Sequence, residues 1–272
     1  MEASLAERNT LLAVFAHPDD ESIIAGGTLA QYAARGWRTA LICATRGEWG
    51  PISDDSLANY ETLGEVRERE LEAACEVLGI SWSCFLDMED GGMAAVPGTE
   101  EEERALKKMV RTIRELRPQI VITFGPDGLY GHPDHVAIGQ LTTTACALAR
   151  DPKAFSEHLT ENLPAHQVPE LLYATVPQGQ YENLIARLAD AGHTTHLWGI
   201  PPEQFGIPAG EITKIIDITP FLDQKLAALR CHRTQIDDSH AFFHLTRDLA
   251  MQYLGHEFFR LAAREPLLAT KD

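Results

Sequence analysis

Short apolar runs alternate with segments of helical period along the 272-residue chain, and this alternation limits the possible folds more than any other feature. A representative helical segment is Tyr60–Leu78, which ends at the stop signal Gly79. Repeated strand–helix–strand order predicts an α/β fold with a mostly parallel sheet and helices on both faces. Six runs rich in β-branched residues are the expected strands: Leu11–Ala16, Thr39–Thr45, Trp82–Leu86, Ile120–Phe124, Leu171–Val176 and Ile212–Ile218.

Three stretches rich in glycine, proline or acidic residues interrupt this pattern and are expected to be loops: Gly47–Asn59, Glu89–Glu103 and Asp151–Pro169. Two of them directly follow expected strands. In a Rossmann-like sheet, ligands bind beyond the carboxyl ends of the strands, so we expect the active site there. The length and the 44% hydrophobic composition fit a single domain over residues 1–272, with 264–272 as a flexible tail.

Charge and composition limit the partners. The chain has 23 basic and 40 acidic residues, and its formal net charge of −17 repels nucleic-acid phosphates and anionic membrane surfaces. No apolar run reaches the ~18 residues that span a bilayer, and the first fifteen residues lack an export signal, so a cytoplasmic location is expected. A homo-oligomer is expected only because proteins of this size often form one. Five cysteines without a CxxC pair are expected as reduced core residues: Cys43, Cys75, Cys84, Cys146 and Cys231.

Two motifs with metal-binding side chains follow strands. The first, AHPDDE, runs from Ala16 to Glu21, and the second, YGHPDH, runs from Tyr130 to His135. Histidine and carboxylate donors suit Zn²⁺, which in catalytic sites typically keeps three protein ligands and one open position. A parallel sheet brings both motifs to one edge. The arrangement therefore predicts one shared metal site.

Each motif alone has a simpler interpretation. Asp19 or Asp20 could accept backbone N–H bonds as a helix N-cap while His17 merely packs. The second motif could likewise be a capping turn, with Pro133 as the first helical residue. Two such motifs at post-strand positions of one sheet favour the metal site over two unrelated caps.

The pair AHPDDE and YGHPDH resembles the LmbE-like, or PIG-L, family of zinc-dependent N-acetylglucosaminyl deacetylases. The resemblance extends from Leu11 to the segment Ala228–Gln235, which is similar to the family's C-terminal H-x-[ST]-Q element. It implies that His17, Asp20 and His135 are the zinc ligands. Because histidine and carboxylate also bind Fe²⁺, iron is the alternative metal.

The same resemblance implies the catalytic roles. Asp19 would be the general base that takes a proton from the attacking water. Tyr130 and a protonated His132 would stabilise the oxyanion, and Asp134 would orient His132 and favour its charged form. Either Asp19, once protonated, or His132 could then protonate the leaving amine.

Substrate binding is expected from four residues by the same comparison: Glu48, Arg67, Asp90 and His232. Glu48 could instead belong to a surface loop, and Arg67 could form a helix-surface pair with Glu70. Asp90 is followed by glycine where the family often has serine. His232 would line the pocket, or else face a helix C-terminus. The remaining histidines are expected in surface or packing positions: His158, His166, His193, His196, His240, His244 and His256.

The resemblance implies a hydrolase that removes the acetyl group from an N-acetylglucosamine derivative, such as GlcNAc-malate or GlcNAc-inositol. The loop Asp151–Pro169 and the stretch Thr234–Asp237 also resemble the amidase branch that cleaves mycothiol conjugates. A non-catalytic sugar- or metal-binding module is a third alternative, disfavoured because Asp19 and all three ligands are intact. A phosphoesterase with two metals is disfavoured because only one ligand set is complete.

Overall fold

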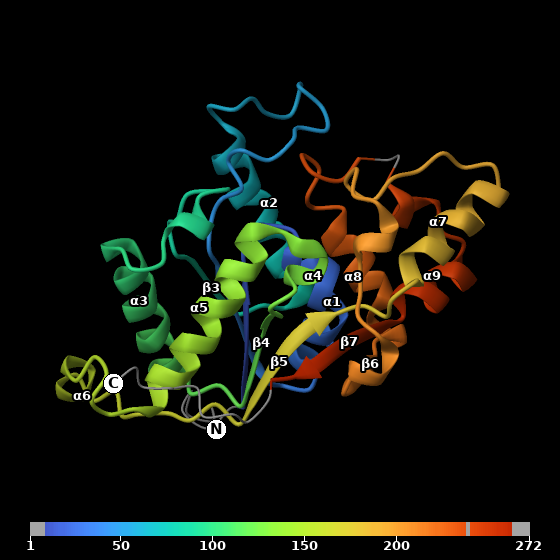
Figure 1. Cartoon of the computed structure of the whole chain (residues 1–272). Coiled ribbons are helices and arrows are strands. Elements are labelled where there is room, and N and C mark those ends of the chain that lie inside the picture. The colour runs from blue at the N-terminus through green and yellow to red at the C-terminus, as the bar shows by residue number, and fades with distance from the viewer. Residues whose placement is uncertain (1–8, 238–239, 263–272) are drawn as a thin grey trace.

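The computed structural model describes residues 9–237 and 240–262, and the expected tail 264–272 lies outside them (Figure 1). The described residues form a sheet of seven strands in the order β3-β2-β1-β4-β5-β7-β6. The strands are β1 (Thr10–Phe15), β2 (Arg38–Cys43), β3 (Trp82–Phe85), β4 (Ile120–Phe124), β5 (Glu170–Thr175), β6 (Lys214–Asp217) and β7 (His256–Leu261). The first five in the sheet are parallel, and β7 is antiparallel to both of its neighbours. The predicted α/β fold is confirmed.

Helices cover both faces of this sheet, with α5 in front of it and α1 behind it in Figure 1. Helices α1, α2 and α8 pack against one another, and α3 packs against α5. The helices are α1 (Asp20–Ala34), α2 (Leu63–Leu78), α3 (Glu100–Leu116), α4 (Gly128–Gly131), α5 (Pro133–Arg150), α6 (Glu157–Thr160), α7 (Gln180–Asp190), α8 (Leu222–Leu229) and α9 (Arg247–Leu254). Short 3-10 turns are η2 (Met93–Ala95), η3 (Pro202–Gln204), η4 (Ala209–Glu211), η5 (Thr219–Phe221) and η6 (Ala241–His244).

The central strand β1 lies within the hydrophobic core, since all six of its residues are buried. This continuous burial is typical of a parallel strand that is covered on both faces. The chain leaves β1 through α1 to reach β2 on one side, whereas β4 pairs with β1 on the other side. The segments that follow β1 and β4 therefore begin next to each other, at the point where ligands bind in folds of this kind.

One strand was not predicted. β7 lies between β5 and β6, and its sequence HEFFRL contains a buried glutamate, Glu257. Glu257 is tolerated there because it accepts hydrogen bonds from the backbone N–H groups of Gly27 and Thr28 and pairs with Lys225. The sixth predicted strand is real but shorter than expected, and it forms the sheet edge.

Other predicted features have close counterparts. Helix α2 begins at Leu63 instead of Tyr60 and ends as predicted at Gly79, whose φ of 73° suits glycine. Helix α3 begins at Glu100, so the last four residues of the loop expected over Glu89–Glu103 are helical instead. All five cysteines are free, three buried and two partly buried. No helix within the described residues is long and apolar enough to cross a membrane.

Candidate metal centre and active site

The two sequence motifs meet at the carboxyl ends of β1 and β4. His17 follows β1, Asp20 begins α1, and His135 lies in the first turn of α5. One potential ligand atom from each lies within 4.8 Å of the others, and His135 Nε2 is 3.4 Å from Asp20 Oδ1. All three side chains are buried. The structure thus brings the expected ligand set together.

The hydrogen bonds around His135 and Asp20 leave one suitable atom of each free for a metal. His135 Nδ1 donates to the Gly128 carbonyl at 3.2 Å, so its Nε2 carries no proton in the neutral ring. Asp20 Oδ2 accepts from the backbone N–H groups of Ala16 and His17, which directs Oδ1 towards His135. Two imidazoles and one carboxylate are a donor set that suits Zn²⁺ or Fe²⁺.

A second group shares His17 with the first. His17, His132 and Asp134 also offer atoms within 4.8 Å of one another. Asp134 Oδ2 lies 3.3 Å from His17 Nε2 and accepts the Gly91 N–H at 2.7 Å. His132 is only half-buried, whereas the first group is buried throughout. The first group is therefore the better candidate centre, with Asp134 as a support for His17.

Burial and neighbouring charges shift the pKa values of all three candidate ligands. Burial raises the pKa of Asp20 to about 7, against the effect of His17. Burial lowers the pKa of His17, but hydrogen bonds to Asp134 and Asp90 outweigh it and raise the pKa to about 10. Burial holds the pKa of His135 well below its usual range, so this ring is neutral and able to act as a ligand.

Asp19 stands beside the candidate centre in an unusual backbone conformation. Its φ is 132°, a value that residues with a side chain rarely adopt. Burial raises the pKa of its carboxyl group, and the Arg67 guanidinium opposes that shift. A buried carboxylate with a raised pKa that faces the cavity is suited to take up a proton.

Arg67 is buried and anchors this corner of the site. Its Nη2 donates to the Pro18 carbonyl at 2.6 Å and lies 3.3 Å from Asp19 Oδ2, while Nη1 donates to the Gly47 carbonyl at 2.9 Å. The alternative of a helix-surface pair with Glu70 is wrong, because Glu70 accepts two hydrogen bonds from Thr234 instead.

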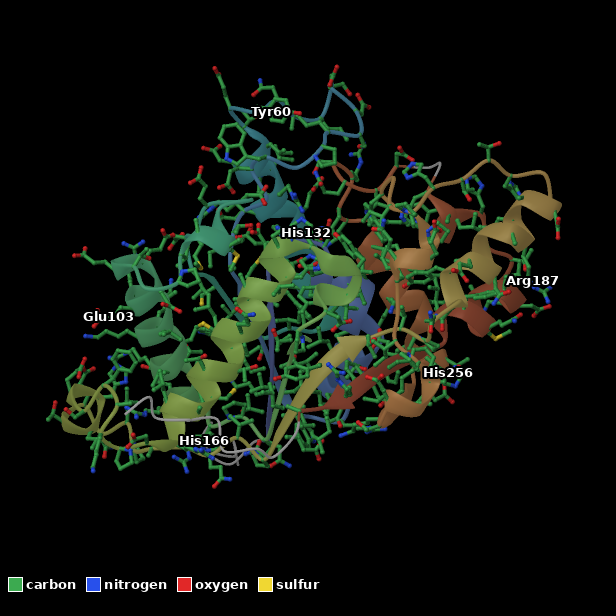
Figure 2. The ribbon with its side chains drawn as sticks, in the orientation of Figure 1. Tyr60, Glu103, His132, His166, Arg187 and His256 are labelled. Atoms are coloured by element: carbon green, nitrogen blue, oxygen red, sulfur yellow. The ribbon has the colours of Figure 1, made fainter. Side chains whose placement is uncertain are left out.

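Tyr130 and His132 line the other side of the candidate centre. The Tyr130 ring centroid is 5.3 Å from that of His135. Burial raises the pKa of Tyr130, so its hydroxyl stays protonated as a donor. Burial and the neighbouring His17 lower the pKa of His132, although Asp134 opposes them. Figure 2 shows His132 at the upper end of α5, above the strands, whereas His166 lies at the bottom of the view, near the opposite ends of the strands.

The expected role of Asp134 needs correction. Its carboxylate faces His17 instead of His132. The backbone N–H of Asp134 does orient His132, because it donates to His132 Nδ1 at 3.2 Å. His132 is thereby the N-cap of α5, with Pro133 as the first helical residue. An accepting Nδ1 places the proton of the neutral ring on Nε2.

A cavity of about 330 Å³ contains these groups. The polar part of its lining includes Arg67, Asp90 and Gln235 beside the candidate ligands and Asp19. The apolar part is formed by Ile23, Ile24, Leu129, Tyr181, Trp198, Ile200 and Phe205. The arrangement can hold a small molecule that has both polar and apolar faces, with its reacting group at the candidate centre.

Comparisons with known proteins agree with this geometry. Residues 12–146 match the sequence profile of the PIG-L family, described as GlcNAc-PI de-N-acetylase. A 1D-myo-inositol 2-acetamido-2-deoxy-alpha-D-glucopyranoside deacetylase from Thermomonospora curvata is 35% identical over 92% of this chain and 89% of its own length. A protein of the same name from Acidothermus cellulolyticus is 36% identical over 93% of this chain and 88% of its own. The chain belongs to the PIG-L family.

Solved structures share the fold of this PIG-L family member. N,N'-diacetylchitobiose deacetylase from Pyrococcus horikoshii has a TM-score of 0.67 at 23% identity, covering 95% of this chain and 85% of that one. GalB, the 4-carboxy-2-hydroxymuconate hydratase from Pseudomonas putida, has a TM-score of 0.65 at 19% identity, covering 97% and 99%. Because its sequence relatives are deacetylases, the PIG-L chain is a hydrolase of the deacetylase class, acting on an amide C–N bond.

Two residues expected to bind substrate in this PIG-L chain do not line the cavity. His232 is fully buried and pairs with Glu21, so the expectation that it lines the pocket is wrong. Glu48 Oε1 accepts the Asp90 N–H at 3.0 Å and so supports the residue beside it. Asp90 itself lines the cavity, with Oδ1 lying 3.1 Å from His17 Nε2.

Sequence reasoning also missed part of the cavity of the PIG-L chain. Tyr181, Trp198 and Phe205 belong to α7 and to the segments that follow it, where no motif marks them. Their aromatic character was the available signal, but aromatic residues in such segments more often pack in the core. Gln235 closes the H-x-[ST]-Q element and lines the polar side, although no role had been assigned to it.

Proposed function

We propose that this protein hydrolyses the acetamide of an N-acetylglucosamine derivative, with GlcNAc-inositol as the leading substrate and Zn²⁺ held by His17, Asp20 and His135. The observation that carries the proposal is the buried His–Asp–His set beside the buried carboxylate of Asp19 in one cavity. Relatives at 35% and 36% identity that are named GlcNAc-inositol deacetylases support the substrate.

Asp19 acts as the general base. Bound zinc supplies a Lewis acid and makes water more acidic. The Asp19 carboxylate takes the proton of the attacking water, and its raised pKa favours this transfer near neutral pH. The Arg67 guanidinium orients the Asp19 carboxylate through its contact with Oδ2.

Tyr130 and His132 stabilise the oxyanion that forms on the acetyl carbonyl oxygen when water attacks the carbonyl carbon. The Tyr130 hydroxyl is a neutral donor. His132 acts as a neutral donor as well, through Nε2–H, because its Nδ1 already accepts the Asp134 N–H. The lowered pKa of His132 keeps the ring neutral. The charged His132 expected from the resemblance is therefore not needed. Asp19, protonated in the first step, returns its proton to the departing amine.

The sugar lies on the polar side of the cavity in this proposal. Arg67, Asp90 and Gln235 offer donors and acceptors for ring hydroxyls. The acetyl methyl group then faces the apolar side. This polarity fits an acetylated amino sugar better than a wholly apolar amide.

The amidase alternative has less support. The loop Asp151–Pro169, one of the two stretches that suggested it, folds around α6 at the opposite end of the strands from the cavity (Figure 1) and contributes no residue to the cavity lining. The second stretch, Thr234–Asp237, contributes Gln235 to that lining. GlcNAc-malate remains a competing substrate of the same chemistry, because only the groups beyond the sugar ring would distinguish it.

The test is release of free amine from GlcNAc, GlcNAc-malate and GlcNAc-inositol by the purified full chain, with zinc and with a chelator. Asp19→Ala is expected to lower kcat by about 10³-fold, as for loss of a general base. Asp55→Ala, which removes an exposed aspartate, serves as the charge-matched control. Zinc-loaded protein that releases no amine from any of the three sugars would contradict the proposal.

A further inference from the structure

A buried pair of ionisable residues contacts the backbone of Asp19 outside the cavity lining. His232 Nε2 is 2.8 Å from Glu21 Oε1, and the two residues are 0% and 1% exposed. The pair joins the first turn of α1 to the turn that follows α8, across 211 positions of sequence. Neither side chain is part of the cavity lining, so neither can touch the substrate.

The Glu21 carboxylate connects this pair to the proposed base. Its Oε2 accepts the backbone N–H of Asp19 at 3.0 Å. Its Oε1 accepts from Ser22 Oγ at 2.5 Å and from His232 Nε2. Every donor on the carboxylate therefore comes from a buried neighbour, and one of them is the backbone of Asp19.

Asp19 needs such a contact because of its backbone. With φ 132° and ψ −29° it occupies a region that is sparsely populated except by glycine. Strained residues persist only where the surrounding structure holds them, and they are concentrated at active sites. The Asp19 carbonyl is held by the N–H groups of Ser22 and Ile23, whereas its own N–H is held by Glu21.

His232 is itself fixed from the far side. Thr234, two residues later, donates its backbone N–H and its hydroxyl to Glu70 at 2.8 and 2.6 Å. Glu70 and Arg67 lie on the same helix, α2. One helix thus holds the Asp19 side chain through Arg67 and the turn carrying His232 through Glu70.

We propose that Glu21 and His232 are positioning residues that hold the Asp19 backbone in its positive-φ conformation and so aim its carboxylate at the reacting atoms. The inference rests on the proposed function of Asp19 as general base. Glu21 acts through one hydrogen bond to Asp19, and His232 acts by donating Nε2–H to Glu21, which orients that carboxylate.

The test compares kcat, KM and zinc content of the zinc-loaded full chain on GlcNAc-inositol. Glu21→Met removes both acceptor oxygens at similar volume, and we expect kcat to fall about 10²-fold, as for a misplacement of about 1 Å. KM and zinc content should change less than about twofold, because the substrate and ligand side chains are untouched. Glu21→Gln keeps an oxygen for the Asp19 N–H and should retain kcat within about fivefold.

His232 provides an independent pair of variants. His232→Leu removes the donor and should lower kcat by about tenfold or more, whereas His232→Gln retains an amide N–H near the place of Nε2 and should restore most of it. These variants keep the inference testable if Glu21→Met does not fold.

A matched control contacts the same helix, α1, from strand β7. Glu257 is also a buried carboxylate that accepts two backbone N–H groups of α1, from Gly27 and Thr28, at 2.9 and 2.8 Å. Glu257→Met, or Glu257→Gln if the first does not fold, should lower the unfolding temperature and leave kcat of the folded, zinc-loaded protein unchanged.

Coupling to Asp19 decides between positioning and a general structural role. In an Asp19→Ala background, Glu21→Met should lower the remaining activity less than about twofold, because the group that it positions is already absent. A further 10²-fold fall in that background, or a loss of zinc, would overturn the inference. So would Glu21→Met with unchanged kcat.

A crystal structure of Glu21→Met, or of His232→Leu, separates this inference from the proposed function. If the wild-type protein hydrolyses none of the sugars, the proposed function fails, but the positioning claim can still be judged. It stands if Asp19 leaves its positive φ in the variant, and it is overturned if the Asp19 backbone is unchanged.

Discussion

The Arg67 guanidinium lies directly against the backbone of Gly47. Nη1 donates to the Gly47 carbonyl at 2.9 Å, and a Cβ added to Gly47 would lie 2.1 Å from that same nitrogen. Gly47 also has a φ of +63°, which disfavours any residue with a side chain. Position 47 thus requires glycine for two separate reasons, and only one of them concerns the active site.

Gly47→Ala is therefore expected to displace Arg67 and weaken its contacts with Pro18 and Asp19. We expect kcat/KM for amine release to fall by about tenfold or more, since the base and a polar cavity wall both move. The free energy of unfolding should fall by about 1–3 kcal/mol from backbone strain and the clash. Steady-state kinetics and urea unfolding measure the two effects.

Gly98→Ala is the control for the backbone effect alone. Gly98 has a φ of +81°, and a Cβ there would meet no atom within 4 Å. It should lose stability and keep its activity. An equal loss of activity in both variants would show that the contact with Arg67 is not responsible.

Zinc should stabilise the protein more at higher pH. The metal-free folded state keeps a proton on Asp20, whose pKa is raised by burial from 3.8 to about 7. It also keeps one on His17, where burial is outweighed by bonds to Asp134 and Asp90 and the pKa rises from 6.5 to about 10. Both pKa values are raised on folding, so their stabilisation is present at low pH and is lost as pH rises through about 7 and about 10.

Zinc binding must release those protons, so its apparent affinity rises over the same range. The unfolding temperature with zinc minus that with a chelator is expected to be larger at about pH 8 than at about pH 6. His17→Ala should remove most of the difference at both values. A difference that is constant or shrinks with pH would contradict the assignment of these ligands.

Removal of the Tyr130 hydroxyl tests the oxyanion contact. Leu129, with φ 68°, and Tyr130, with φ −143°, break the helical geometry of α4 and turn the ring towards His135. Tyr130→Phe keeps the ring, so we expect kcat to fall about 10²-fold with little change in KM. Tyr173→Phe, which loses a hydroxyl bonded to Thr143 outside the cavity, is the control. A change confined to KM would instead assign Tyr130 to substrate binding.

The fold and the centre of the site could be predicted because their signals are local. The core of β1 is an unbroken apolar run, α2 has a helical period and a glycine stop, and each histidine motif lies in the connection after a strand. Parallel pairing of β1 with β4 then brings the motifs together without any further information.

The remaining features depend on contacts between distant segments. β7 was missed because Glu257 looks unsuitable for a central strand until Lys225 and the turns of α1 are seen around it. His232 was expected in the pocket from the family resemblance. The structure shows that Glu21 lies between His232 and Asp19, and no sequence pattern indicates this contact. Local pattern cannot reveal which buried polar group has a partner.

A last prediction concerns stability away from the site. The buried side chain of Arg114 donates to the carbonyls of five residues in the last turn of α5 and in the segment after it. These residues are Leu148, Ala149, Asp151, Ala154 and Phe155. A guanidinium can reach several carbonyls at once because its five N–H groups form a rigid fork, which an ammonium group cannot reproduce.

Arg114→Lys should therefore leave several partly buried carbonyls unpaired and lower the free energy of unfolding by about 2–4 kcal/mol. Arg104→Lys, an exposed change on the same helix, should cost less than about 0.5 kcal/mol. Because this segment lies at the opposite end of the strands from the cavity, kcat of the folded Arg114→Lys protein should be unchanged. Urea unfolding and amine-release kinetics test both parts, and a fall in kcat without loss of stability would show that this segment communicates with the active site.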